Sequence, residues 1–117
     1  MSVSELLRWQ WEGYPRYHAS RFNRVLHIAV VPLFVVGNVV LIAALIAESW
    51  ITAVIGGAAM VVSVALQGRG HRQEAVPPEP FTSPLNAVLR IFFEQWITFP
   101  RFVLSGGWLD AIRKSAP

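Results

Sequence analysis

Two consecutive stretches without a charged side chain constrain this chain more than any other feature. Val25–Ala47 and Ser49–Gly68 contain no Asp, Glu, Lys or Arg, and only Glu48 separates them. Each stretch is about as long as the roughly 20 apolar residues, at about 1.5 Å rise each, that a helix needs to cross a bilayer core. A chain of 117 residues, 54% hydrophobic and 15% charged, also lacks the polar surface to cover two such helices in water. The sequence therefore predicts a small integral membrane protein.

The two stretches predict an all-α membrane hairpin, in a single domain over residues 1–117. We expect the first span over residues 21–47 and the second over 50–67, because the connection at Glu48 and Ser49 is too short for anything but an antiparallel return. The basic residues that flank the hairpin on its open side are Arg8, Arg16, Arg21, Arg24, Arg69 and Arg72, and the turn has none. The positive-inside rule then places the open end in the cytoplasm, in a bacterial inner membrane or, if the source is eukaryotic, the endoplasmic reticulum.

A short interfacial helix is expected over residues 2–12, ahead of the first span. Ser2 and Glu5 have the spacing of a capping box. The Trp and Tyr side chains that follow are amphipathic aromatics of the kind found at headgroup depth. Pro15 is expected to break or restart this helix.

The C-terminal part of the chain predicts a loop and then an amphipathic helix. Residues 68–84 are rich in Gly, Pro and charge, which is typical of a loop. Residues 85–104 are apolar and aromatic, yet Arg90, Glu94 and Arg101 fall at spacings of four and seven, on one helical face. Such a helix lies in the interface, re-enters the membrane or forms a third membrane helix, and the sequence leaves these arrangements open. Residues 108–117 predict a short interfacial tail.

The three histidines of the chain are brought together by topology alone. A hairpin returns to its starting side, so His71, just after the second span, is expected near His27 inside the first and His18 before it. Imidazole is a common ligand of Fe, Zn, Cu and Ni, and a carboxylate completes many such sites. Glu74, three residues after His71, is the expected carboxylate. The pattern predicts a metal site; the alternative is a set of solvated histidines at a membrane interface.

Three further residues are candidates around this site. Asn23 precedes His27 by four residues and is placed to orient its ring. Glu94 either joins the site or forms an ion pair with Arg90, and Arg101 is a candidate for binding an anionic headgroup. The absence of Cys excludes disulfides and thiolate metal sites. The net charge of +3 is spread along the chain, so nucleic acid is not an expected partner.

Most of the chain, from about Tyr14 to Trp108, resembles a family of small membrane proteins. The family is typified by the fungal 2-hydroxy fatty acid dioxygenase of phytosphingosine breakdown, and this chain looks like a bacterial-type branch of it. The residues that carry the resemblance are Tyr17-His18, Asn23 and His27 around the start of one span and Gly70-His71-Arg72-Gln73-Glu74 at the exit of the next.

The resemblance implies a haem-free, Fe(II)-dependent dioxygenase that shortens a long-chain 2-hydroxy fatty acid by one carbon. It also implies that His18, His27 and His71 are catalytic iron ligands, with Glu74 as a ligand or a support to one. Two other functions stay open on the residues alone: a non-enzymatic membrane scaffold or partner-binding subunit, and haem ligation by His27 and His71. The exposed surface of two helices is compatible with a homo-oligomer.

Overall fold

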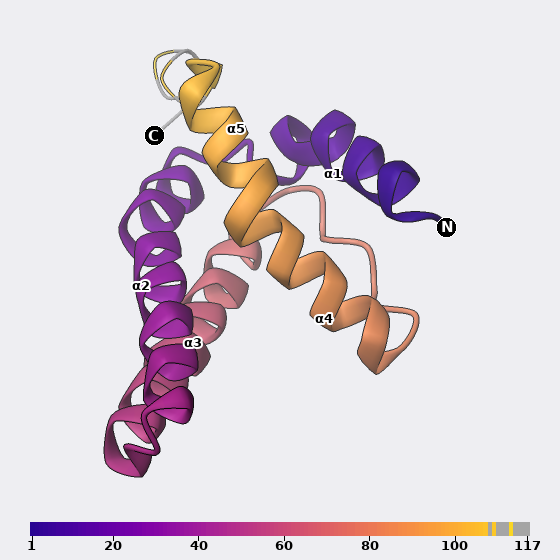
Figure 1. Ribbon diagram of the computed structural model, residues 1–117. Coiled ribbons are helices and arrows are strands. Elements are labelled where there is room, and N and C mark those ends of the chain that lie inside the picture. The colour runs from indigo at the N-terminus through magenta and orange to yellow at the C-terminus, as the bar shows by residue number, and fades with distance from the viewer. Residues whose placement is uncertain (108, 110–112, 114–117) are drawn as a thin grey trace.

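The computed structural model describes residues 1–107, 109 and 113 (Figure 1). Apart from 109 and 113, the tail predicted over residues 108–117 therefore lies outside the described residues. The elements in chain order are α1 (Val3–Tyr17), α2 (Arg21–Ile46), α3 (Trp50–His71), α4 (Pro84–Phe93), a π-helix η1 (Glu94–Thr98) and α5 (Phe99–Leu104). The all-helical class is confirmed, and no strand occurs in this part of the chain.

The helices α2 and α3 pack against each other along their length and run in opposite directions. A short turn joins them, in which Glu48 adopts a positive φ of 56°. Gly37 and Gly56 meet near the turn, and farther along Ser63 donates to the carbonyl of Val30. A Cβ on Gly56 would lie 2.7 Å from a backbone nitrogen of α2, so this close approach requires glycine. The antiparallel packing brings the start of α2 beside the end of α3.

Among the described residues, α2 and α3 are the two helices long and apolar enough to cross a membrane. Only 28% and 22% of their most apolar windows are buried inside the molecule. A core helix of a soluble protein would be mostly buried, whereas α2 and α3 carry many large apolar side chains that are exposed. The most exposed of them are Ile46, Ile51, Val54 and Val61, each at least 69% exposed.

The helix α1 is longer than the sequence predicted and continues through Pro15 to Tyr17. A proline this close to a helix end removes one hydrogen bond without breaking the preceding turns. The last turn is kept by His18, whose backbone N–H and ring Nδ1 lie 3.1 and 2.9 Å from the carbonyl of Tyr14. The helix therefore ends at the histidine, which positions the His18 ring.

The helix α3 extends about one turn beyond the predicted second span and ends at His71. Because this turn contains Gly68 and Gly70, the sequence predicted a loop here, and that prediction is wrong for residues 68–71. Gly70 is instead a buried residue of the helix that packs closely against α2. A Cβ at this position would collide with the side chains of Asn23 and Leu26. The loop consequently shrinks to residues 72–83.

The predicted helix over residues 85–104 is continuous in space but contains the π-helix η1. The N–H of Phe99 donates to the carbonyl of Glu94, five residues earlier. Pro100 has no N–H to offer the carbonyl of Trp96, which favours the wider turn. The side chains of Gln95 and Thr98 are buried by this turn.

A small apolar core holds α1 and α5 against the start of α2. Its buried members are Tyr14, Val31, Phe99 and Phe102, with Trp11, Ile28, Val35 and Val103 packed against them. In Figure 1, α1 and α5 accordingly lie at the end of the α2–α3 pair away from its turn.

Candidate metal centre

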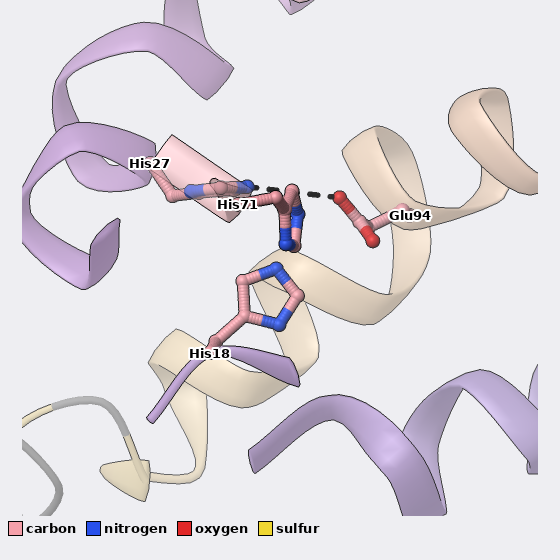
Figure 2. A group of neighbouring side chains, drawn as sticks. All are labelled: His18, His27, His71 and Glu94. Atoms are coloured by element: carbon pink, nitrogen blue, oxygen red, sulfur yellow. Dashed lines mark ion pairs between the residues drawn. The ribbon is translucent and has the colours of Figure 1, made fainter. Parts of the chain in front are cut away.

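The three histidines meet at the end of the α2–α3 pair, each supplied by a different segment. His18 caps α1, His27 lies in the second turn of α2 and His71 is the last residue of α3. Their ring centroids lie 4.6, 4.7 and 5.1 Å apart. Glu94 completes the group, and one ligand atom from each of the four residues lies within 4.8 Å of all the others. Figure 2 shows these side chains pointing toward a common centre.

The ring nitrogens that face this centre have no hydrogen-bond partner among the residues that the structure describes. His18 Nδ1 lies 2.9 Å from the carbonyl of Tyr14, and His27 Nδ1 lies 2.9 Å from that of Asn23. The remaining Nε2 atoms of both rings, and Nδ1 of His71, are buried and unpartnered. Each such buried atom costs about 1–3 kcal/mol unless something binds it.

The Nε2 atoms of His18 and His27 are in the chemical form that a metal ion needs. A backbone carbonyl that accepts from Nδ1–H fixes the tautomer, so the lone pair of Nε2 points into the centre. Burial, with the neighbouring His27 and His71, holds the pKa of His18 well below its usual value, which favours the neutral, ligating ring. The donor set therefore fits a transition-metal ion.

Glu94 is the carboxylate of the centre. Its Oε2 lies 4.0 Å from Nε2 of His27 (Figure 2). Burial raises the pKa of Glu94 to about 7, and the charge of Arg90 opposes this rise. A bound cation would favour the ionised carboxylate, because opposite charge at short range stabilises the charged form.

The structure brings Glu94, and not Glu74, to the histidines. The carboxylate of Glu74 accepts hydrogen bonds from the backbone N–H of Ala19 and Ser20 at 3.0 and 2.9 Å, and from Asn23 Nδ2 at 2.7 Å. It thus stabilises the N-terminus of α2, where a negative charge is favourable. The expected placement required α3 to continue past His71, but the helix ends there and the following turn points Glu74 elsewhere.

The other two candidates do not contribute a side chain to the centre. Asn23 holds the ring of His27 through its backbone carbonyl, and its side chain bonds to Glu74. Arg101 is exposed, with its guanidinium 3.9 Å from the ring centroid of Trp11. Of the candidates around the histidines, Glu94 is therefore the one that the fold brings to them.

Two buried glutamines that the sequence reasoning missed connect Glu94 to α3. Gln67 and Gln95 exchange two hydrogen bonds of 2.8 Å, and Gln67 also donates to Ser63. Gln95 Nε2 lies 3.4 Å from Glu94 Oε2. Gln67 is a polar side chain within an apolar span, one turn before His71, and such residues mark functional sites in membrane helices. That signal was available in the sequence.

A cavity of about 230 Å³ opens beside the centre, between α1, α3, the 72–83 loop and α4–η1. His18, His71 and Glu94 line one part of it, and apolar side chains such as Val64 and Ile91 line another. The four converging groups, which could hold a metal ion, therefore lie next to a cavity with both polar and apolar walls.

Residues 5–101 match the family model described as 2-hydroxy-palmitic acid dioxygenase Mpo1-like. The matched range covers most of the chain and includes every residue of the centre. No curated protein and no solved structure matches the chain significantly. The family match confirms the resemblance seen in the sequence: the chain belongs to the Mpo1-like family.

Proposed function

We propose that this protein is a membrane-embedded, non-haem iron(II) dioxygenase that acts on a 2-hydroxy fatty acid. The observation that carries the proposal is the set of buried, unpartnered imidazole nitrogens that converge with Glu94. The name of the family, 2-hydroxy-palmitic acid dioxygenase, supports the reaction class and the class of substrate.

The metal ligands in this proposal are His18, His27, His71 and Glu94. Imidazole and carboxylate ligands with open positions are typical of non-haem iron in oxygenases. Iron bound there would supply the activation of molecular oxygen and a binding point for the hydroxyl and carboxylate oxygens of the acid. The residues of the chain orient the ligands through the carbonyls of Tyr14 and Asn23, and the apolar side chains of the cavity, such as Val64 and Ile91, lie beyond the metal ligands.

The membrane part of the proposal is a transmembrane hairpin formed by α2 and α3, with the centre at its cytoplasmic end. The exposed apolar faces of both helices support it. The basic residues beside the centre and their absence from the turn at Glu48 support the orientation. A fatty acid dissolved in the same leaflet then has its carboxylate at the depth of the metal ligands.

The haem alternative fits the geometry poorly. The rings of His27 and His71 lie 5.1 Å apart at 83°, and the ring of His18 packs against both. This packing leaves no space for a porphyrin between them.

The proposal is tested by product formation in lipid nanodiscs. Full-length protein loaded with Fe(II) under anaerobic conditions is expected to convert 2-hydroxypalmitic acid, once oxygen is admitted, to the acid one carbon shorter. The variant His71→Ala is expected to form no product, whereas Gln73→Ala, an exposed neighbour in the same motif, keeps the wild-type rate. Wild-type protein that holds iron yet consumes no substrate would contradict the proposal. A non-enzymatic scaffold would likewise consume no substrate.

A further inference from the structure

The cavity beside the centre runs along one face of α3, away from the metal ligands. Val64, Gln67, Gly68 and His71 all line it, at the spacings of three and four residues that define one helical face. His71 marks its polar end. Val64 lies seven residues earlier, about 10 Å away at 1.5 Å per residue. The opposite wall repeats this order, with Glu94 at the polar end and Ile91 one turn away.

Beyond the centre, the wall of the cavity offers a ligand few hydrogen bonds. Gln67 and Gln95 line it, but their amides bond to each other. Gln10 is likewise engaged, since it donates to the carbonyl of Arg90 and accepts from Thr98. The amides of these three glutamines are therefore not free to bind a polar ligand, so this part of the wall favours an apolar one.

Arg90 is the one Lys or Arg among the described residues of the wall, and it is also engaged. Its guanidinium donates to the carbonyls of Glu79 and Pro80 at 2.8 and 3.0 Å. It lies between aromatic rings, 4.9 Å from the ring centroid of Trp9 and 4.5 Å from that of Phe81. Those rings face the cavity and add to its apolar surface. The cavity is thus polar at the metal ligands and apolar beyond them.

Gly68 leaves an open part in this wall. A Cβ built on it meets no heavy atom within 4 Å, in contrast to Gly56 and Gly70, where the backbone or side chains of α2 lie too close. A larger residue at 68 can therefore be accommodated by the helix, and its side chain would extend beside the cavity. The neighbouring position on the same face, Val64, is only partly buried.

On the basis of the proposed function, we infer that this cavity binds the alkyl chain of the 2-hydroxy acid and that Val64 and Gly68 determine the chain length accepted. The carboxylate and hydroxyl end then lies at His18, His71 and Glu94, and the unbranched tail follows the face of α3. A side chain at position 68 shortens the space for the tail, and a smaller one at 64 lengthens it.

Three variants of the full chain test this inference. Gly68→Leu narrows the cavity, Val64→Ala widens it, and Gly57→Leu is the matched control. Gly57 is also a glycine of α3 with open space around its Cβ, and it does not line the cavity. Because Leu is a better helix former than Gly, neither leucine variant is expected to lose the helix.

Binding is measured in lipid nanodiscs by displacement of a fluorescent fatty acid with saturated 2-hydroxy acids of increasing chain length. Gly68→Leu is expected to weaken binding of the longest acids at least about tenfold relative to short ones, the usual effect of a lost fit for a methylene or more. Val64→Ala is expected to shift the preference to longer chains, and Gly57→Leu to leave it unchanged. An unchanged preference in Gly68→Leu and Val64→Ala, or an equal shift in Gly57→Leu, would overturn the inference.

Metal content and turnover are measured on the same samples, which separates the two proposals. If the length preference shifts as described in protein that holds no metal, the inference stands and the proposed function fails. If the wild type holds iron and oxidises the acid while the variants keep its length preference, the proposed function stands and the inference fails.

Discussion

At the scale of single residues, the two glutamates considered as metal ligands make different contacts. Glu74 belongs to a histidine motif and yet binds just before α2, where its carboxylate accepts from the backbone N–H groups of Ala19 and Ser20. Glu94 lies far along the chain and yet faces the histidines. The difference follows from where helices end, since a residue three positions past His71 shares its face only if the helix continues.

The two glutamates are therefore expected to respond differently to substitution. Glu94→Gln removes a carboxylate ligand and should weaken Fe(II) binding at least about a hundredfold. Loss of a residue that only supports a ligand already weakens binding by up to about a hundredfold, and loss of the ligand itself should cost at least as much. Glu74→Ala should leave metal affinity nearly unchanged but lower the free energy of unfolding by about 1–3 kcal/mol, because it leaves the backbone N–H groups of Ala19 and Ser20 without this acceptor. Anaerobic metal titration and thermal unfolding of both variants check this pair. A loss of Fe(II) affinity in Glu74→Ala with none in Glu94→Gln would instead indicate that Glu74 is the metal ligand.

At the scale of elements, the π-helix η1 and the turn at the end of α3 are fixed to each other by buried amides. Gln95 is 1% exposed and bonds to Gln67 on α3, while its nitrogen approaches Glu94. Gln95 and Thr98 are the buried residues of the wider helical turn that begins at Glu94. From this contact we expect the amide pair to position Glu94 at the proposed centre.

Loss of this contact is expected to appear in metal binding. Gln95→Ala should weaken Fe(II) affinity by about tenfold to a hundredfold, the usual effect of removing a group that supports a ligand. Ile97→Ala is the matched control, because Ile97 lies in the same element and is 42% exposed. Gln95→Met, which keeps the volume of the side chain but removes its amide, should lose as much Fe(II) affinity as Gln95→Ala, and this result would distinguish positioning by the amide from a general loss of packing. Equal losses in the Ile97 and Gln95 alanine variants would argue against a positioning role.

At the scale of the whole molecule, the features set by hydropathy and topology were predictable from the sequence. The uncharged stretches located α2 and α3 to within about a turn, and their short connection brought His27 and His71 together. Glu94 could not be assigned in this way, because its position depends on the 72–83 loop and on the rotation of η1. Both are set by tertiary contacts, such as the hydrogen bonds of Gln10 and Gln67, that no local pattern encodes.

The proposed topology can be measured directly because the chain has no cysteine. Single cysteines are introduced as Glu48→Cys in the turn and Gln73→Cys beside the centre, both at exposed positions. A membrane-impermeant thiol reagent is expected to label Gln73→Cys only from the cytoplasmic side and Glu48→Cys only from the opposite side. Labelling of both cysteines from one side would contradict a transmembrane hairpin.

The central claim is that three histidines and Glu94 hold one metal ion, and the metal content of the purified protein tests it most directly. Elemental analysis after anaerobic loading with Fe(II) and removal of excess ion is expected to give one iron per chain for the wild type. His27→Ala, which removes a buried ligand from the first span, is expected to retain less than about a tenth of that amount. A wild type without stoichiometric metal, or a His27→Ala variant that retains it in full, would contradict the claim.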